Sequence, residues 1–598
     1  MSCRLHSHRS RQPRNQRSVD GQIQQTDRSG LKNIIAVTRI KWANLLSTLF
    51  ILLTVSLSVT ANASTHPKQH AVASAHPLAT QAGINILEKG GNAFDAAIAV
   101  ASVLAVVEPY SSGFGGGGFW LIYNAEKDQH TFIDGRETAP EKAHPKLYQD
   151  ASNRVIKSLS INGPLAAGIP GQAAALAHLA KHYGKLPLKE TLSEAIHFAE
   201  KGFPVDEVYR KLAGYRLKAM QSDTTTSAVF LVNGEIPKLN HLIVQTALAN
   251  ALRRLADQGR DGFYKGVTAQ HLVSNMQPHG GIWSLKDLAN YQIIERQPIR
   301  FEYQGHKFIT APPPSAGGIA LAQMFGMLSH LQLPDQPSAA QTQLLVEVMR
   351  RAYRDRAEYL GDPQFTDIPS KLTSPNYIKN LASTIQYEKA TPSSDLKAVL
   401  PPKQGTDTTH YSILDKDGNR VSATLSINLP FGSAYTDPDT GLLLNNEMDD
   451  FSSQPGVPNA YGLIATRANE VHAGKRPLSS MTPTFIESDH SLAILGTPGG
   501  SRIITMVFLG ALEHLNQAPV ERWVSRARFH HQYLPDVIQH EPDTFSDAEK
   551  LQLEKYGYTL KSVGRTYGNM QAVLWDKTKN KIFAASDPRR IGSSKIGN

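Results

Sequence analysis

A polar segment rich in helix- and strand-breaking residues, at residues 388–406, most constrains what this chain can fold into. On both sides of it, helical stretches alternate with short runs that are typical of strands, so one mixed core interrupted once is expected. The segment holds Pro392, Ser393 and the pair Pro401-Pro402. We predict an exposed, mobile segment, with a strand beginning directly after it.

The first sixty residues are predicted to be a targeting segment rather than part of the folded domain. Residues 42–63 carry no charge, follow Arg39 and Lys41, and end in an Ala-x-Ala pattern, which is the order of regions in a secretory signal. An uncleaved membrane anchor is the alternative, because about 20 apolar residues can span a bilayer. Residues 1–41 are a basic extension or reflect a misassigned start. Cleavage would leave an exported chain, periplasmic or secreted, that begins at Ser64.

Charge and cysteine content exclude several functions. The net charge is +10, but residues 1–41 contribute +7 of it, so the body is nearly balanced and nucleic-acid binding is not expected. The only cysteine is Cys3, which removes thiolate zinc sites, disulfides and cysteine nucleophiles from the body. His530 and His531 have no third ligand at metal spacing. We therefore predict neither a metal nor a cofactor.

The first part of the body is predicted to be mostly helical. One helix is expected over residues 76–107, with Glu108-Pro109 ending it. The glycine run that ends at Gly118 leads into a strand at residues 119–123, where a phosphate loop would need a Lys-Ser/Thr pair and a helix. The glycines therefore indicate close backbone packing. Further helices are expected within residues 165–300 and at 339–360.

A β-hairpin is predicted directly after the break. Residues 407–414 form its first strand, and Asp417-Gly418 is a strong signal for the turn into the second. A two-residue turn places Thr408 opposite Ile427, whereas a three-residue loop with a bulge places it opposite Asn428. In both registers Thr408 lies within a few ångströms of the segment Ser426–Asn428. Taken alone, Thr408 would be an ordinary strand start.

Two later segments concentrate polar chemistry. Residues 444–451 contain three carboxylates and two amides, and residues 496–502 form a glycine turn before an apolar helix that starts at Ile503. Glycines just before a helix N-terminus expose backbone N–H groups that can stabilise a developing oxyanion. The alternative is a plain turn in which Ser501 is the N-cap.

Together these motifs resemble the γ-glutamyltransferase (γ-glutamyl transpeptidase) family of N-terminal-nucleophile hydrolases, from about His70 to Asp587. The resemblance implies an α+β fold, a four-layer αββα sandwich, made as an inactive precursor that cleaves itself before a threonine while its pieces stay together. Here that means cleavage between Asp407 and Thr408, a large subunit of residues 64–407 and a small subunit of residues 408–598. The motifs that carry the resemblance are Gly115–Gly118, Asp134–Pro140, Ala167–Gly171, Thr408–Ser412, Asn445–Phe451, Pro477–Met481 and Gly496–Ile503.

The resemblance also assigns residue roles. The nucleophile is Thr408, whose own α-amine, with an ordinary pKa of about 7.7–8.0, serves as its base after cleavage. The fork of a guanidinium suits a substrate α-carboxylate. The implied roles are a hydroxyl partner at Ser426, oxyanion donors at Gly499 and Gly500, carboxylate ligands at Arg136, Ser479 and Ser480, ammonium ligands at Asn428, Glu447 and Asp450, and a lid tyrosine at Tyr461.

The implied activity is transfer of γ-glutamyl groups from glutathione and similar amides to water or to an amino acid, without a cofactor. A β-lactam side-chain (glutaryl-type) acylase of the same superfamily is one alternative, but its substrates need no α-amino acid head. The joint presence of Arg136, Asn428, Asp450 and Ser479-Ser480 favours that head. A non-processed exported binding protein is the other alternative, and the intact motif that starts at Thr408 argues against it.

Overall fold

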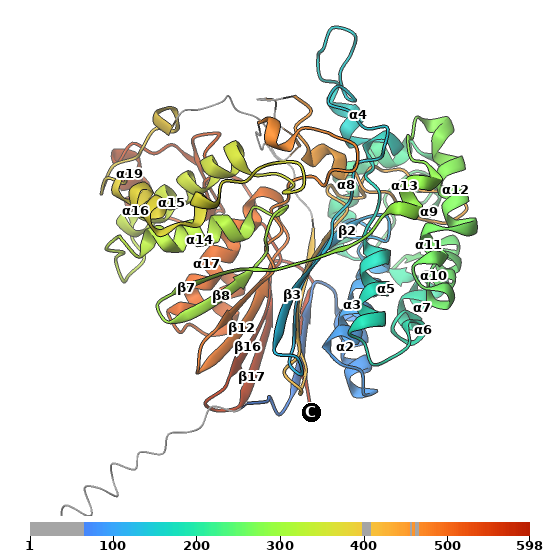
Figure 1. The fold of residues 1–598 in the computed structure, drawn as a ribbon, viewed down its shortest axis with the longest axis horizontal. Helices are drawn as coiled ribbons and strands as arrows, with labels where there is room; N and C mark the ends of the chain where they lie inside the picture. The colour runs from blue at the N-terminus through green and yellow to red at the C-terminus, as the bar shows by residue number, and fades with distance from the viewer. Residues whose placement is uncertain (1–64, 397–407, 455–456, 458, 461–465) are drawn as a thin grey trace, which may run out of the picture. The chain divides into compact units, whose positions relative to one another are not determined.

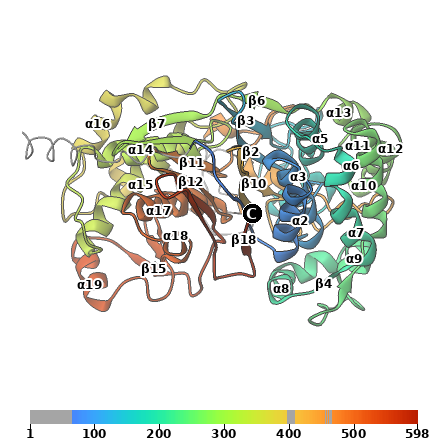
Figure 2. The same cartoon turned by 90° about the horizontal axis from the view of Figure 1, so that it is seen from below.

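The computed structural model describes residues 65–396, 408–454, 457, 459–460 and 466–598, all within one unit, Ala63–Asn598 (Figure 1). Two sheets face each other, and helices cover the outer face of each (Figures 1 and 2). The predicted α+β sandwich is confirmed. The predicted extension and signal lie outside the described residues. Within the described ranges, no helix is both long and apolar enough to cross a bilayer.

The larger sheet has seven strands, and each neighbouring pair is antiparallel. Strands from before residue 388 and from after residue 406 interleave in it, so the two parts of the chain share one sheet. Its central strands are those of the predicted hairpin. In order across the sheet the strands are β18 (Ser593–Gly597), β1 (His70–Ser74), β9 (Thr409–Leu414), β10 (Arg420–Ser426), β2 (Gly117–Asn124), β3 (Gln129–Gly135) and β6 (Ile294–Arg296).

The second sheet has six strands and also joins both parts of the chain. Its inner face packs against the first sheet, where β12 and β16 contact β9. Its strands in order are β17 (Lys581–Ser586), β16 (Gln571–Asp576), β12 (Ser491–Gly496), β11 (Thr484–Glu487), β8 (His306–Thr310) and β7 (Ile299–Tyr303). Two small sheets contain β13 (Phe529–His530), β14 (Ile538–His540) and β15 (Leu560–Ser562), and β4 (Phe203–Pro204) and β5 (Leu242–Ile243).

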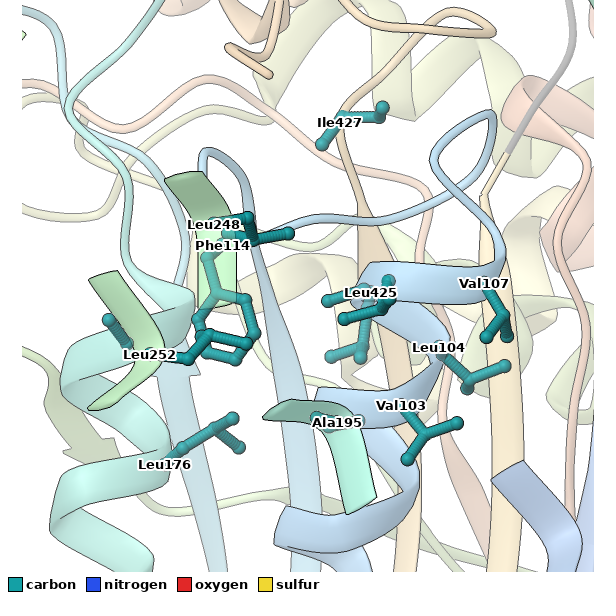
Figure 3. Packing of buried hydrophobic residues seen from close by; sticks show 14 of the residues in the cluster. Val103, Leu104, Val107, Phe114, Leu176, Ala195, Leu248, Leu252, Leu425 and Ile427 are labelled. Carbon is teal, nitrogen blue, oxygen red and sulfur yellow. The ribbon is translucent and has the colours of Figure 1, made fainter. Parts of the chain in front are cut away.

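One helical layer covers the seven-stranded sheet. Figure 3 shows its core, where Val103 and Leu104 of a buried helix lie near Leu425 of the hairpin. Burying such aliphatic side chains stabilises the fold by about 1.5–3 kcal/mol each. The helices on this side are α2 (Pro77–Glu88), α3 (Ala93–Val107), α4 (Lys157–Ile161), α5 (Gln172–His182), α6 (Leu188–Thr191), α7 (Ser193–Lys201), α8 (Glu207–Gln221), α9 (Thr224–Phe230), α10 (Thr246–Gln258), α11 (Asp261–Tyr264), α12 (Gly266–Met276) and α13 (Leu285–Asn290).

The other helical layer covers the six-stranded sheet and forms a second core. Phe325 and Phe508, from two of its helices, pack edge to face with ring centroids 4.9 Å apart. The predicted helix at 339–360 is confirmed as α15. This layer contains α14 (Gly317–Leu328), α15 (Ala339–Tyr359), α16 (Pro375–Ser383), α17 (Ile503–Leu515), α18 (Val520–Ser525) and α19 (Asp547–Lys555).

Two sequence predictions need correction. The helix expected over residues 76–107 is two helices. The first ends at Glu88, Gly90 takes a φ of +90°, and Asn92 then caps α3 through a capping box with Asp95. The break segment is not exposed throughout. Most of residues 388–396 are exposed or half-buried, but Ser393 is buried and its hydroxyl donates to the Tyr533 carbonyl oxygen, at 2.7 Å. Residues 397–406 lie outside the described residues.

The close packing predicted for the glycine run is confirmed. A Cβ on Gly115 would stand 2.1 Å from the Leu443 carbonyl oxygen, and a Cβ on Gly116 would stand 2.2 Å from the Ser426 carbonyl oxygen. Both distances are too short for any side chain. The glycines therefore allow the loop before β2 to lie directly against the end of β10, where the predicted site residues begin.

Candidate active site

Thr408 directly precedes the hairpin strand β9, and only 4% of its surface is exposed. Leu414 pairs with Arg420 and Thr409 with Leu425, so the loop between the strands has five residues. Both predicted registers are therefore wrong: one step beyond these pairs, Thr408 faces Ser426 rather than Ile427 or Asn428. The Asp415 carboxylate stabilises the longer loop by accepting from the backbone N–H and the side chain of Asn419, each at 2.9 Å.

The residues after Thr408 are held firmly. The Thr409 hydroxyl donates to Glu108 Oε2 at 2.7 Å, and Glu108 is the C-cap of α3. His410 accepts from or donates to the Thr424 hydroxyl at 2.8 Å, and burial lowers its pKa to about 3, so its imidazole is neutral. These contacts fix the strand that carries Thr408.

Thr408 opens onto a small cavity. The cavity brings together most of the predicted site residues, from the ends of β3, β9 and β10 and from three later loops. Among the described residues that line it there is no histidine or lysine that could act as a base for Thr408. The lining residues are Arg136, Arg356, Thr408, Ser426, Asn428, Asp450, Leu478, Ser479, Ser480, Met481, Gly500, Ser501 and Ile503.

Two predicted residues, Glu447 and Gly499, do not line this cavity, and two others lie outside the described residues. Glu447 does not line the cavity but pairs with Arg136 directly behind its wall. Gly499 lines a neighbouring hollow. Asp407 and Tyr461 lie outside the described residues.

Arg136 follows β3 and is surrounded by carboxylates. Its guanidinium pairs with Glu447 at 2.7 Å, with Asp450 at 2.5 Å and with Glu137 at 3.5 Å. Burial opposes its charge, but these three carboxylates outweigh burial and raise the pKa of Arg136. The cation is therefore permanent and already balanced by protein groups.

The carboxylates beside Arg136 respond in the opposite direction. Burial, helped by neighbouring carboxylates, raises the pKa of Glu447 and of Glu137 despite the attraction of Arg136. Three carboxylates share one cation here, so a second cation would relieve the excess negative charge. A substrate ammonium group is such a cation.

Asn428 is held in an unusual backbone conformation next to this cluster. Its φ angle is +72°, in the left-handed region that non-glycine residues seldom adopt. Its backbone N–H donates to Ser426 Oγ at 2.8 Å, and its side-chain amide donates to the Asn446 carbonyl oxygen at 2.8 Å. Strain of this kind concentrates at binding sites, where the surrounding structure enforces it.

A second arginine reaches the cavity and was missed by the sequence analysis. Arg356 of α15 is 3% exposed, and its Nη2 donates to Ser480 Oγ at 3.3 Å. Within the described residues it forms no ion pair, and its buried Nε has no hydrogen-bond partner. Burial lowers its pKa. The helical pattern of residues 339–360 gave no signal that separates this arginine from others in the same helix.

The adjacent serines lie on a tightly bonded loop. The backbone N–H of Ser479 donates to the Pro314 carbonyl oxygen at 2.9 Å, and Ser479 Oγ accepts from the N–H of Met481 at 3.1 Å. The Pro477 carbonyl oxygen of the same loop accepts from Arg136 Nε at 3.3 Å. The loop therefore presents two hydroxyl groups beside both arginines.

The glycine turn after β12 faces Thr408 across the cavity. Gly499 has φ +145° and Gly500 has φ +57°, and a Cβ on Gly499 would stand 2.4 Å from the Met506 methyl carbon. Neither glycine donates its N–H to another described residue. The alternative in which Ser501 is the N-cap is wrong: the N-cap of α17 is Arg502, and the Ser501 hydroxyl donates to Gln532 at 2.7 Å.

Known proteins match this chain over nearly all of the described fold. The sequence profile described as Gamma-glutamyltranspeptidase matches residues 79–596. The glutathione hydrolase proenzyme of Escherichia coli is 39% identical, with 89% of this chain and 93% of the relative covered. That of Pseudomonas aeruginosa is 41% identical, with 87% and 93% covered.

A solved structure confirms the architecture. The crystal structure of cephalosporin acylase from Bacillus halodurans aligns with a TM-score of 0.79 and 26% identity, covering 89% of this chain and 96% of that one. The family inferred from the motifs is thus confirmed by sequence over the whole fold. This chain belongs to the gamma-glutamyltranspeptidase family.

Proposed function

We propose that this chain is an exported γ-glutamyltransferase and hydrolase that cleaves γ-glutamyl amides such as glutathione. One observation carries the proposal. A single cavity joins the Thr408 side chain, the Gly500 backbone and the Arg136–Asp450 ion pair. A hydroxyl nucleophile, backbone donors and a paired set of charges are what an acyl-transfer site for an α-amino acid head requires.

The charges around Arg136 suit a zwitterionic head. The substrate α-carboxylate binds the Arg136 guanidinium, with Ser479 and Ser480 as hydroxyl donors. The α-ammonium binds Asp450 in the cavity wall, and the charge of Glu447 supports it from behind that wall. In the empty site the Arg136 guanidinium and the neighbouring carboxylates pair with each other. When substrate binds, each of them pairs with a substrate charge instead, so no buried charge is left unpaired. Asn428 lies beside the ammonium position and contributes its side-chain oxygen.

Activation requires cleavage of the Asp407–Thr408 bond. The Thr408 hydroxyl attacks the Asp407 carbonyl carbon, the peptide nitrogen leaves as the free α-amine, and water hydrolyses the resulting ester. The products are a carboxylate on Asp407 and a new N-terminus at Thr408. The large subunit would then be residues 64–407 and the small subunit residues 408–598, held together by the interleaved strands of both sheets.

Turnover then uses the new α-amine as the base. This amine takes the proton of the Thr408 hydroxyl as its oxygen attacks the γ-carbonyl carbon, and it passes that proton to the leaving amine. The neutral, buried His410 and the absence of histidine and lysine from the described cavity wall support this assignment. The N–H groups of Gly499 and Gly500 stabilise the oxyanion, and Ser426 donates to the nucleophile.

The γ-glutamyl ester on Thr408 is resolved by water or by the amine of an amino acid or peptide. Water gives glutamate, and an amine gives a new γ-glutamyl amide. Tyr461 closes the site as a lid during these steps. The signal at residues 42–63 exports the enzyme to the periplasm or the medium before it meets its donor.

An acylase of the same superfamily is the second candidate, and the TM-score of 0.79 to the cephalosporin acylase favours it. A glutaryl-type substrate has a carboxylate but no α-ammonium. Two observations weigh against it: Glu447 and Asp450 are retained beside Arg136, and the curated relatives at 39–41% identity are named glutathione hydrolases.

A chromogenic donor tests the proposed function. Purified protein is incubated with a γ-glutamyl p-nitroanilide, and its subunit composition is followed on a denaturing gel. The native chain should form two pieces and release nitroaniline, whereas Thr408→Ala should stay one piece and release none. Thr408→Ser is the matched control, because it keeps the hydroxyl and should still cleave itself and turn over. Release of nitroaniline by Thr408→Ala would refute the assignment.

A further inference from the structure

The glycine turn that faces Thr408 needs support from its neighbours. Gly499 and Gly500 have no side chains and both have positive φ angles, so no packing of their own restricts the direction of their N–H groups. An oxyanion site requires N–H groups that already point in a fixed direction before the reaction starts. The residues on either side of the two glycines must therefore supply this order.

The segment before the glycines is held by residues close to it in the second sheet. Thr497 is fully buried, and its hydroxyl donates to the Pro498 carbonyl oxygen at 3.0 Å. The same hydroxyl accepts from the backbone N–H of Asn569 at 3.2 Å. Asn569 directly precedes β16, the strand next to β12, so one side of the turn is tied to the sheet from which it emerges.

The residue after the glycines is held at two points. Ser501 lines the active-site cavity together with Gly500. Its hydroxyl donates to Gln532 Oε1 at 2.7 Å, and its carbonyl oxygen accepts from the hydroxyl of Tyr353. Both the side chain and the backbone of Ser501 are therefore fixed, and the peptide units of the turn inherit this order.

Tyr353 is well suited to hold the turn. It belongs to α15, which lies in the same helical layer as α17, the helix that follows the turn (Figure 2). Its side chain is almost completely buried, and its ring packs edge to face on His530 with centroids 5.4 Å apart. Burial raises the pKa of Tyr353, so its hydroxyl keeps its proton and remains a donor.

We propose that Tyr353 is a positioning residue for the oxyanion site. By donating to the Ser501 carbonyl oxygen, it fixes the turn so that the N–H of Gly500 points at the oxygen of the tetrahedral intermediate on Thr408. The inference rests on the proposed function, since it concerns the same acyl-transfer site.

The hydrogen bond also joins the two proposed subunits. Tyr353 belongs to the proposed large subunit, whereas Thr408, the glycines and Ser501 belong to the proposed small subunit. The small subunit thus carries the nucleophile and the oxyanion donors, but the large subunit supplies part of the order that these donors need.

This role predicts a selective effect on the transition state. The glutamyl head binds at Arg136 and its neighbours, whereas the glycine turn contacts only the oxygen on which charge develops. An interaction of this kind changes kcat, while binding of the head, and with it KM, stays nearly constant. A tyrosine that served packing alone would have no such selectivity.

Tyr353→Phe tests the proposal, because it removes the hydroxyl and keeps the ring. With processed enzyme and the γ-glutamyl p-nitroanilide, kcat should fall about 10- to 100-fold, somewhat less than the loss of an oxyanion donor itself costs. The KM should change less than about threefold. The same selectivity is measured with two inhibitors: glutamate, and its analogue with a boronic acid in place of the γ-carboxyl, which forms a tetrahedral adduct with a hydroxyl nucleophile. Only the boronate should bind more weakly, by about the factor lost from kcat.

Tyr558→Phe is the matched control. Tyr558 is 5% exposed, and its hydroxyl donates at 2.6 Å to Glu347 of the same helix, α15. This variant also loses a buried tyrosine hydroxyl that bonds to or from α15, but that hydroxyl has no contact with the turn. It should keep the native kcat and the native affinity for the boronate.

Ser501→Ala is the second variant, because it releases the same turn from Gln532. It should show the same selective loss, and it decides the question if Tyr353→Phe does not form two pieces. A kcat within twofold of the native value in the processed variants, or equal weakening of boronate and glutamate binding, would overturn the proposal. Failure of the native enzyme to release nitroaniline would instead refute the proposed function, so the two failures are distinguishable.

Discussion

The two arginines that reach the active-site cavity are both almost completely buried, yet their surroundings are opposite. Arg136 touches three carboxylates, and its pKa is raised. Arg356 touches a serine hydroxyl and no carboxylate of the described chain, and burial lowers its pKa. One cation is fully balanced before any substrate arrives, whereas the other is not.

The contrast suggests a division of labour in binding. In the empty site the Arg136 guanidinium pairs with protein carboxylates. When a zwitterion binds, its carboxylate pairs with Arg136, and its ammonium pairs with the protein carboxylates that Arg136 no longer holds. Arg356 forms no ion pair with a described residue, although Asp450 in the wall of the same cavity favours its charge. It acts through Ser480, whose hydroxyl it orients, and is thus a positioning residue.

The largest expected effect comes from Arg136→Gln. Removing this cation leaves three neighbouring carboxylates together in a buried site, which costs about 3–5 kcal/mol of stability. It also removes the proposed partner of the substrate carboxylate. We expect kcat/KM for the anilide to fall at least about 1,000-fold. Steady-state kinetics and thermal unfolding of the purified variant measure both. Retention of activity within threefold would show that the balanced cation is structural only.

Arg356→Gln should have an intermediate effect and a different signature. Because Arg356 forms no ion pair with a described residue and donates to Ser480, its loss should cost about 0.5–1.5 kcal/mol of stability, as for one hydrogen bond. The KM for the donor should rise about 10- to 100-fold with a smaller change in kcat, and Arg356→Lys should restore part of the loss. The exposed Arg300 of β7 offers a matched control, as Arg300→Gln should change neither constant. A fall in kcat with an unchanged KM would contradict a binding role.

A smaller effect is expected in the pH dependence of binding. The pKa of Glu447 is raised in the empty site, so its carboxyl holds a proton at pH values where an ordinary glutamate is ionised. Binding of an ammonium group requires the ionised form, so it should release a proton, and affinity should increase with pH through that range. Calorimetric titration with glutamate in buffers of different ionisation enthalpy measures the proton release. Glu447→Gln should abolish it, and a native enzyme that releases none would contradict the assignment.

The smallest effect on activity is expected at a carboxylate that serves the fold. Glu487, 19% exposed, pairs with His130 at 2.9 Å and with Arg420. Burial opposes its charge, but these partners outweigh burial and lower the pKa of Glu487 to about 2. Its folded pKa lies below the ordinary value, so its stabilisation is present above about pH 4.5 and is lost as the pH falls towards 2.

Glu487→Gln should therefore remove about 2 kcal/mol of stability at neutral pH and leave kcat/KM unchanged. Denaturant unfolding at pH 7 and at pH 3.5 measures this, with a smaller difference between variant and native protein at the lower pH. An equal difference at both values would show that the ion pair is not the source. The direction of the pKa shift thus separates this structural carboxylate from those beside Arg136.

Local signals in the sequence predicted which helices and strands form better than they predicted the boundaries of these elements and the register between strands. The Asp417-Gly418 turn identified the hairpin, but the Asp415 side chain holds a five-residue loop and shifts the register to place Thr408 opposite Ser426. A capping side chain likewise divided a helix that composition made continuous. Such side-chain contacts become visible only when the chain is folded.

The site followed the same rule. The roles predicted for Thr408, Gly499-Gly500 and Arg136 came from the family resemblance, because none of these residues stands out by its local pattern alone. Arg356 could not be found, because one arginine in a helix looks like another until its neighbours are known. The hollow beside Gly499 is assembled from one helix and three separate turns, so no contiguous motif marks it.

The central claim is that Thr408 becomes a chain terminus and that this terminus performs the chemistry. Sequencing the smaller piece of fully active, purified enzyme from its amino end tests it most directly. The account predicts Thr-Thr-His as the first three residues, in an amount equal to the number of active sites titrated by acylation. A different first residue in that fully active sample, or full turnover by an uncleaved chain, would contradict it.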